Sequence, residues 1–522
     1  MGDGNVKRVA KNTVIMYIRM IVLMCISFVT SRLFLQALGV EDYGIYSIVG
    51  SVTSTFVALK SLFSESVQRF LNFYKGKQDI NTQKDVFTIS LLIHAALAVI
   101  FVILLEIIGL WLINNKLVYP IEKYDAVIFV FQMTVISSVL SILCIPFDAV
   151  IIANERMGFF AFLSIFDGVL RLLVVLLLPI LPFPALKTYA FLIIFIPLSS
   201  LVISSIYSRR FEECKLSKTI NKGIYKDILS LSGWNFFGNI SFSILHEGIN
   251  FILNIFGGLV YNAARSIAYQ VKSIAVQFST NSLIAARPMV MQSAAVDNEN
   301  KALFRNIIEI SRIAFFIMLI PTIPIIVYCP ELLNIWLTII PDNTTLFTRL
   351  VVLGVLFRSL HEPLNMLYMS VGKIKRMMII EVIVMITAIF IIYIVLSQGA
   401  PMWVAFALLA IMEIVIVLCL LINARRELRF PLLEYIKQVI LPFISLLLIS
   451  TLVAFLFSFI KTDLIVLLLV LCVALITVTV CTIIPFMNEQ EKRIVKNFIA
   501  SKKSKYNSNN INDNKNESTD YL

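Results

Sequence analysis

Charged residues are scarce in this sequence. Asp, Glu, Lys and Arg make up 15% of its 522 residues, whereas apolar residues make up 59%. Soluble domains usually carry about 25% charged residues. A soluble core this apolar would leave too little polar surface to cover itself. The composition therefore excludes an ordinary soluble domain and predicts a chain that crosses a membrane many times.

Metal and nucleotide signatures are also missing. The chain has three histidines and seven scattered cysteines, with no CxxC pair and no His/Cys cluster. It contains no GxxxxGK[ST] loop for ATP and no HExxH or GxSxG motif. We therefore expect no metal site, no catalytic residues and no cofactor. If the chain transports a substrate, an ion gradient, the membrane potential or the substrate gradient must drive it, with H⁺ or Na⁺ as the coupling ion.

Apolar runs, each long enough for one membrane-spanning helix, recur along the chain. At roughly 20 residues per span they predict about 14 helices. The first run contains Arg19 and Arg32 and is too long for a cleaved signal peptide. Breakers separate many of the runs, among them Gly39, Gly257-Gly258 and Gly399. The expected spans are 12–38, 43–63, 86–113, 126–152, 159–180, 187–207, 232–256, 260–285, 305–329, 346–371, 375–396, 402–423, 437–459 and 464–486.

The basic residues between these spans and near their ends are distributed unevenly. Most lie in the N-terminal segment, in the loops after even-numbered spans and in the tail, while the other side has only Lys116, Lys123, Lys187, Arg349 and Lys461. Cytoplasmic loops carry such an excess of Lys and Arg. We therefore expect a multi-pass protein of a bacterial inner membrane with both termini in the cytoplasm. The net charge of +12 is then mainly a topology signal, and nucleic acid is not an expected partner.

The chain shows an internal repeat of six spans. Gly39 and Tyr43 recur as Gly257 and Tyr261, and at nearly the same spacing Pro146 recurs as Pro363. Repeats of an even number of spans share one orientation and can rock about a cavity between them. The predicted fold is an all-α polytopic membrane protein with two six-helix parallel-repeat lobes around a central cavity plus two C-terminal helices. The expected parts are an N-lobe (1–207), a cytoplasmic loop (208–231), a C-lobe (232–423), spans 13 and 14 (424–486) and a partly disordered tail (487–522).

Ionisable residues inside the spans are the candidates for function. Each costs about 2.5–3.5 kcal/mol on insertion scales, so each suggests a site. Arginine suits phosphate oxygens because its forked donors bind them bidentately. The basic candidates for an anion site are Arg19, Arg32, Arg265, Lys272 and Arg358, and the candidates for ion coupling are His246, Glu247, His361 and Glu362. Asp167 and Arg171 are four residues apart and are expected to form a structural pair.

Two short motifs resemble a known family. The stretch LGVEDYGIY at 38–46 and the turn ANERM at 153–157 are similar to those of bacterial polysaccharide-export flippases. The twelve-plus-two arrangement of spans looks like the MOP (multidrug, oligosaccharidyl-lipid, polysaccharide) exporter superfamily. Within it, the chain most resembles Wzx-type flippases of O-antigen or capsule repeat units.

The resemblance implies a substrate and a mechanism. An oligosaccharide on undecaprenyl pyrophosphate would move from the cytoplasmic to the periplasmic leaflet by alternating access. Expected partners are this lipid-linked oligosaccharide, membrane lipids and other polysaccharide-assembly membrane proteins, and the chain is expected to be a monomer.

Three alternatives stay open. The chain could be a lipid II flippase or a cation-coupled multidrug antiporter of the same superfamily. From another class, it could be a membrane glycan polymerase, although no large outward loop is present to carry catalytic groups.

Overall fold

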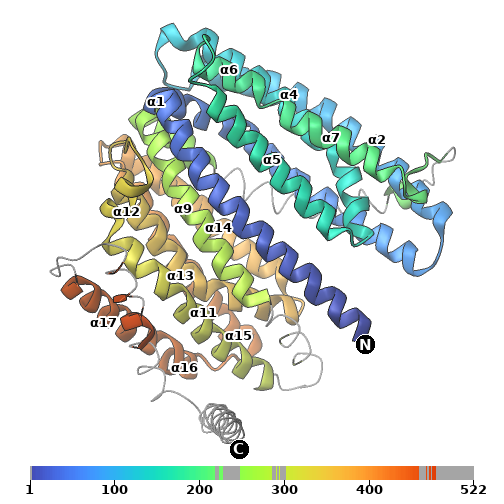
Figure 1. Cartoon of the computed structure of the whole chain (residues 1–522). Helices are drawn as coiled ribbons and strands as arrows, with labels where there is room; N and C mark the ends of the chain where they lie inside the picture. The colour runs from blue at the N-terminus through green and yellow to red at the C-terminus, as the bar shows by residue number, and fades with distance from the viewer. Residues whose placement is uncertain are drawn as a thin grey trace, which may run out of the picture. The chain divides into compact units, whose positions relative to one another are not determined.

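A computed structural model shows the chain as an assembly of helices (Figure 1). The structure describes residues 3–217, 223–226, 247–284 and 301–457, together with isolated residues between 290 and 477. Every element in the described part is helical, so the predicted all-helical fold is confirmed. The long helices are α1 (Asp3–Gly76), α2 (Ile80–Leu104), α4 (Tyr124–Ala153), α5 (Met157–Leu177), α9 (Leu259–Ile284), α11 (Lys301–Val327), α13 (Thr344–Ser370), α14 (Ile374–Ser397) and α15 (Trp403–Leu428).

Shorter elements complete or connect these helices. A π-helical turn (Leu105–Gly109) and α3 (Leu110–Asn115) extend α2, while α6 (Ala185–Leu192) and α7 (Phe195–Ser208) together form one crossing. Residues 247–257 are helical and lead into α9. The remaining short elements are 3₁₀ turns at Ile121–Lys123 and Glu212–Cys214, α12 (Cys329–Trp336), α16 (Leu432–Tyr435), a second π turn (Ile436–Ile440) and α17 (Leu441–Phe457).

Ten helical stretches among the described residues are long and apolar enough to cross a membrane. They account for predicted spans 1–6 and 9–13. Spans 1 and 2 are matched by a single stretch, because together they form the long helix α1. Span 8 corresponds to α9, which has the length of a span but carries many polar side chains. Predicted spans 7 and 14 lie wholly or largely outside the described residues.

The two halves of α1 are separated by a kink at Gly39. This residue has φ 75° and ψ 176°, a conformation that interrupts the helix and that only glycine adopts without strain. The equivalent break before α9 falls at Gly258, which has φ 79°. The sequence repeat pairs Gly39 with Gly257. In the second copy of the repeat, the kink therefore lies one residue after the glycine that aligns with Gly39.

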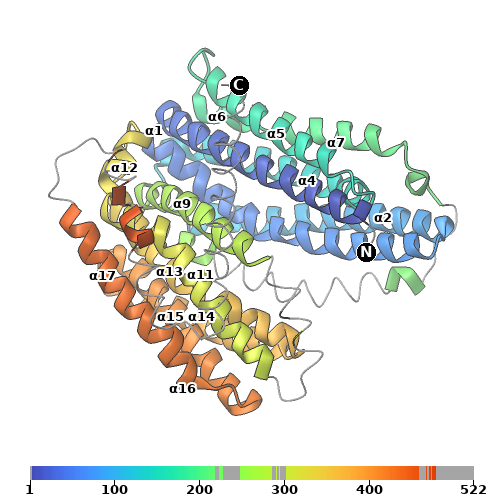
Figure 2. The same ribbon diagram turned by 60° about the horizontal axis from the view of Figure 1, so that its bottom comes forward.

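The chain groups into two compact units. The first comprises Met1–Val276, Tyr328–Val355 and Ile374–Ile416, and the second comprises Gln277–Val327, Leu356–Lys373 and Val417–Leu522. These groupings reflect packing and not repeated sequence, so the predicted lobe boundaries stay a prediction. In the first unit, α1 packs against α4 and α5, and α4 also packs against α2 and α7 (Figures 1 and 2).

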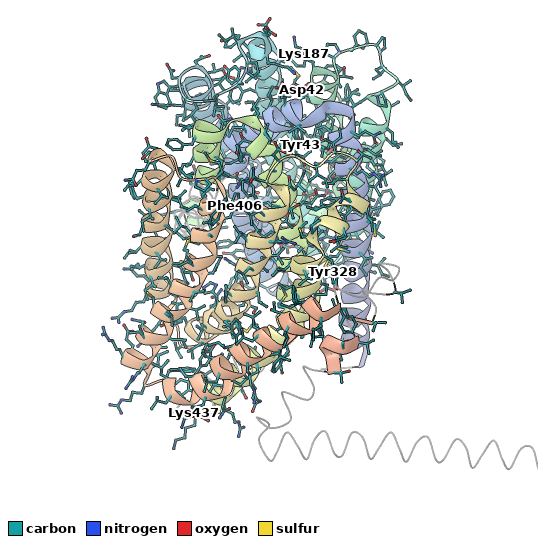
Figure 3. All side chains as sticks on the ribbon, turned by 90° about the vertical axis from the view of Figure 1, so that its left-hand side faces the viewer. Asp42, Tyr43, Lys187, Tyr328, Phe406 and Lys437 are labelled. Atoms are coloured by element: carbon teal, nitrogen blue, oxygen red, sulfur yellow. The ribbon has the colours of Figure 1, made fainter. Side chains whose placement is uncertain are left out.

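Polar contacts place the loops of the first unit at alternating ends. The Lys123 ammonium group pairs with Asp42, which joins the loops after spans 1 and 3. Figure 3 shows Asp42 and Lys187 at this same end. At the other end Lys75 donates to Asn154 (2.6 Å), which joins the loops after spans 2 and 4. The helices therefore alternate in direction, as the uneven distribution of basic residues predicts.

The second unit is held together by aromatic packing and by a buried hydroxyl. Phe315 of α11 and Phe443 of α17 have ring centroids 4.0 Å apart. The buried Tyr368 hydroxyl donates to the carbonyl oxygen of Leu420 at 2.8 Å. The first contact joins α11 to α17, and the second joins the C-terminal parts of α13 and α15.

Candidate functional site

A cavity of about 650 Å³ lies within the first unit. Its walls come from both halves of α1, from α5 and α6, from the helical segment 247–257 and from α9. The volume falls within the usual range of ligand pockets, about 300–1,000 Å³. We refer to it as the first cavity. Residues from both predicted lobes therefore line a single cavity within one compact unit.

Four ionisable side chains face the first cavity. They are two arginines and two carboxylates: Asp167, Arg171, Glu247 and Arg265. The formal charges of these four side chains balance. The cavity is therefore not uniformly basic, although the five basic candidates suggested a basic cavity. Opposite charges within a low-dielectric interior attract strongly. Glu247 lies 3.4 Å from Arg265, and Asp167 lies beside Arg171.

Two contacts orient the Arg265 side chain. Its side chain is buried, with one guanidinium nitrogen 3.4 Å from a Glu247 carboxylate oxygen. Its guanidinium carbon lies 4.0 Å from the centre of the Tyr269 ring, one helical turn further along α9. A cation stacked on an aromatic face is stabilised by about 0.5–2 kcal/mol. The contacts with Glu247 and Tyr269 thus fix the orientation of the guanidinium group.

Arg171 is surrounded by aromatic side chains. Arg171 lies beside Asp167, Tyr46 and Tyr189, deep in the bundle. Its side chain is nevertheless exposed, because it faces the cavity. The Tyr46 and Tyr189 rings meet edge to face, with centroids 5.1 Å apart. Phe34 packs on Tyr189 with a centroid distance of 4.2 Å. Sequence reasoning assigned Arg171 to a structural pair with Asp167, but the structure shows that both residues also line the cavity.

The other basic candidates lie in different surroundings. Arg19 donates to the Ser164 hydroxyl (3.2 Å) and stacks over Phe160, so it adjoins the cavity wall. Arg32 is exposed and donates to the carbonyl oxygen of Ile335 (3.2 Å). The Lys272 ammonium group lies 4.8 Å from the centre of the Tyr269 ring, next to Arg265.

The remaining candidates do not join the first cavity. Arg358 and Glu362 pair across one turn of α13, at 4.0 Å, within the second unit. His361 is buried in the same helix. His246 lies outside the described residues. Of the nine candidates, Arg265 and Glu247 line the cavity, while Arg19 and Lys272 lie beside it.

A buried amide network joins α1 to the segment 247–257 and to α9. Asn262 donates to the side-chain oxygen of Asn250 at 2.8 Å and accepts from Asn254 at 2.9 Å. Asn250 donates to the Ser51 hydroxyl at 2.6 Å. All three asparagines are completely buried. Sequence reasoning missed this network, although three asparagines at residues 250, 254 and 262 of apolar spans were a signal.

The same region allows a close approach of backbones. The Ser47 hydroxyl hydrogen-bonds to the Ser266 hydroxyl. A Cβ atom on Gly44 would lie 2.9 Å from the carbonyl carbon of Leu259. Glycine at position 44 therefore lets α1 contact the start of α9 directly.

A metal centre is not evident in the part of the chain that the structure describes. No group of three or more His, Cys, Asp or Glu side chains there could hold a metal ion. The site is instead a cavity of paired charges, phenols and hydroxyls enclosed by membrane-spanning helices. Such a cavity can hold a polar or ionic group inside a membrane.

Solved structures with the same arrangement of helices are transporters. The lipid II flippase MurJ in its inward closed conformation superposes with a TM-score of 0.68 at 14% identity, covering 93% of this chain and 100% of MurJ. An inward-facing multidrug resistance MATE family transporter of the MOP superfamily gives 0.65 at 14% identity, covering 79% of this chain and 98% of its own.

The chain has the fold of the MOP transporter superfamily.

A MOP superfamily transporter from Pyrococcus furiosus, described as having a binding pocket of reverse polarity, gives a TM-score of 0.60 at 13% identity, covering 81% of this chain and 96% of its own. No family model matches the chain, and no curated protein matches it in sequence. The predicted MATE-like fold is therefore confirmed by structure, at sequence identities that show the fold and no more.

Proposed function

We propose that this chain is a flippase for lipid-linked oligosaccharides. Its substrate is an O-antigen, capsule or exopolysaccharide repeat unit on undecaprenyl pyrophosphate, which it moves from the cytoplasmic to the periplasmic leaflet by alternating access. The observation that carries the proposal is the first cavity, where Arg171 and Arg265 face a polar space inside a MOP fold. Guanidinium groups bind phosphate oxygens through paired, charge-assisted hydrogen bonds.

The extent of the structural matches supports a lipid substrate. The flippase MurJ covers 93% of this chain, whereas the MATE transporter covers 79%. MurJ is described as a lipid II flippase, so lipid II is the second candidate substrate, and it would use the same arginines because it shares the pyrophosphate group.

Deletion in the native cell tests the proposal. We expect cells lacking the protein to accumulate undecaprenyl-linked repeat units on the cytoplasmic face, and wild-type protein to restore export. Arg265→Ala should not restore it, whereas Arg426→Ala, which removes an exposed arginine in the last turn of α15, should. Loss of resistance to cationic drugs without such accumulation would instead indicate an antiporter, and arrested peptidoglycan synthesis would indicate a lipid II flippase.

A further inference from the structure

A second cavity of about 580 Å³ lies beside the first, within the same compact unit. It is enclosed by α4, by α5 and by residues 193–200 of the sixth crossing. Ser164, Asp167 and Arg171 line both cavities, so one face of α5 forms their common wall. Any ligand group that reaches Arg171 therefore lies next to both spaces.

The lining of the second cavity is rich in hydroxyl groups. Four serines and two aspartates face it, together with Arg171 and the ring of Phe160; the serines are Ser137, Ser141, Ser164 and Ser200, and the aspartates are Asp148 and Asp167. A Ser204 hydroxyl also approaches Asp148 at 3.4 Å. So many polar groups inside a membrane-spanning bundle are costly unless they have hydrogen-bond partners.

Some of these groups already have partners and others do not. Ser200 donates to Asp167, and Ser164 donates to the carbonyl oxygen of Phe160 at 2.9 Å. The hydroxyl groups of Ser137 and Ser141, one turn apart on α4, make no hydrogen bond to another side chain or carbonyl oxygen among the residues that the structure describes. Their hydroxyl groups are only partly buried and face the open space, where a ligand can reach them.

The combination of groups favours a polyhydroxylated ligand. A sugar hydroxyl donates to a carboxylate and accepts from a guanidinium or a serine, so a sugar ring satisfies every kind of group in this lining. A bare cation could pair with Asp148 or Asp167 but would leave the Arg171 guanidinium and the serine hydroxyls without a matching partner. A prenyl chain would bury Asp148, Asp167 and Arg171 against hydrocarbon, which is unfavourable. The Phe160 ring adds a flat apolar surface on which the C–H face of a sugar can pack.

We propose that the second cavity is a carbohydrate subsite that receives the sugar next to the pyrophosphate, while Arg265 and Arg171 hold the phosphates in the first cavity. This inference rests on the proposed function. It adds that the chain recognises its cargo through sugar hydroxyls as well as through charge. Because the first sugar is bonded directly to the pyrophosphate, the two subsites must adjoin, and the shared wall of α5 meets that requirement.

Binding of soluble saccharides tests the subsite without the lipid. Purified full-length protein in lipid nanodiscs would be titrated with a panel of methyl glycosides, with and without N-acetyl groups, and separately with inorganic pyrophosphate. Saturation-transfer NMR reports the saccharide, and calorimetry reports pyrophosphate. Ser141→Leu removes a hydroxyl group and narrows the second cavity with an apolar side chain that a membrane helix tolerates. Ser199→Leu is the matched control, since Ser199 lines neither cavity and donates to its own helix at Ile196 (2.8 Å).

We expect at least one glycoside to bind wild-type protein and the control, and its affinity to fall about tenfold or more in Ser141→Leu, which is the effect of losing a hydrogen bond or two. Pyrophosphate affinity should stay unchanged in Ser141→Leu and fall in Arg265→Ala. Pyrophosphate binding without any glycoside binding would overturn the subsite and leave the proposed function standing. Equal glycoside binding in Ser141→Leu and wild type would also overturn it, as would sodium binding that is lost in Asp148→Asn.

Discussion

The buried amide network gives a stability prediction that can be worked from its geometry. Asn262→Ala removes three hydrogen bonds: two donated to the side-chain and main-chain oxygens of Asn250, both at 2.8 Å, and one accepted from Asn254 at 2.9 Å. Hydrogen bonds between helices in membrane proteins average about 0.6 kcal/mol, which gives about 2 kcal/mol for three. At the value of about 1 kcal/mol typical of soluble proteins the loss is about 3 kcal/mol.

Reversible unfolding in mixed micelles measures this loss. We expect Asn262→Ala to lower the free energy of unfolding by about 2–3 kcal/mol. Asn115→Ala is the matched control, because Asn115 is exposed and its amide donates to the carbonyl oxygen of Trp111 in the same helix (2.9 Å). We expect the control to change stability by less than about 0.5 kcal/mol, as surface substitutions do. Equal stability of Asn262→Ala and wild type would refute the view that this network joins α9 to the segment 247–257.

Three further predictions follow from single positions. Gly44→Ala should destabilise the protein by about 1–3 kcal/mol in the same unfolding assay, because the new Cβ atom meets the backbone of α9. Gly50→Ala is the control and should not destabilise it, because the space around Gly50 is open. Equal effects of the two substitutions would refute the close approach of α1 to α9. In intact cells a membrane-impermeant maleimide should label Lys116→Cys, at the end expected to face outward, and should not label Lys215→Cys at the opposite end; the reverse pattern would invert the predicted topology. Burial raises the pKa of the Cys214 thiol to about 12, so alkylation of this thiol at pH 8 should be far slower than that of an ordinary thiol with a pKa near 8.5. The alkylation rate should rise about tenfold per pH unit up to about pH 11. An alkylation rate that levels off near pH 9 would contradict this environment.

The fold was largely predictable because a membrane constrains local sequence strongly. Each span must satisfy its backbone hydrogen bonds internally, so apolar runs mark helices directly. The expected breaks at Gly39, Gly258 and Gly399 are all glycines with positive φ in the structure. The register between helices has no such local signal. The repeat aligned Gly39 with Gly257, whereas the residue with positive φ is Gly258, the second residue of the predicted Gly257-Gly258 break.

The site was less predictable, for a different reason. The cost of a charge inside a membrane identified Arg265 and Glu247, which the structure brings together at 3.4 Å. The same cost could not show which face of α5 turns toward a cavity, so Asp167 and Arg171 were interpreted as a structural pair. The direction in which a helix face points depends on tertiary packing, which the sequence of a single helix does not encode. Uncharged residues such as Asn262 are also cheaper to bury and stand out less.

Transfer of the substrate across a bilayer tests the central claim most directly. Purified protein would be reconstituted into liposomes with a polyprenyl-pyrophosphate-linked oligosaccharide, and the glycan exposed on each leaflet would be measured with an impermeant glycan-modifying enzyme. We predict transfer by wild-type protein, an intermediate rate for Arg265→Lys, which keeps the charge but not the forked donors, and a rate reduced roughly tenfold or more for Arg265→Ala. No transfer by wild-type protein, or equal transfer by wild type and Arg265→Ala, would contradict the account.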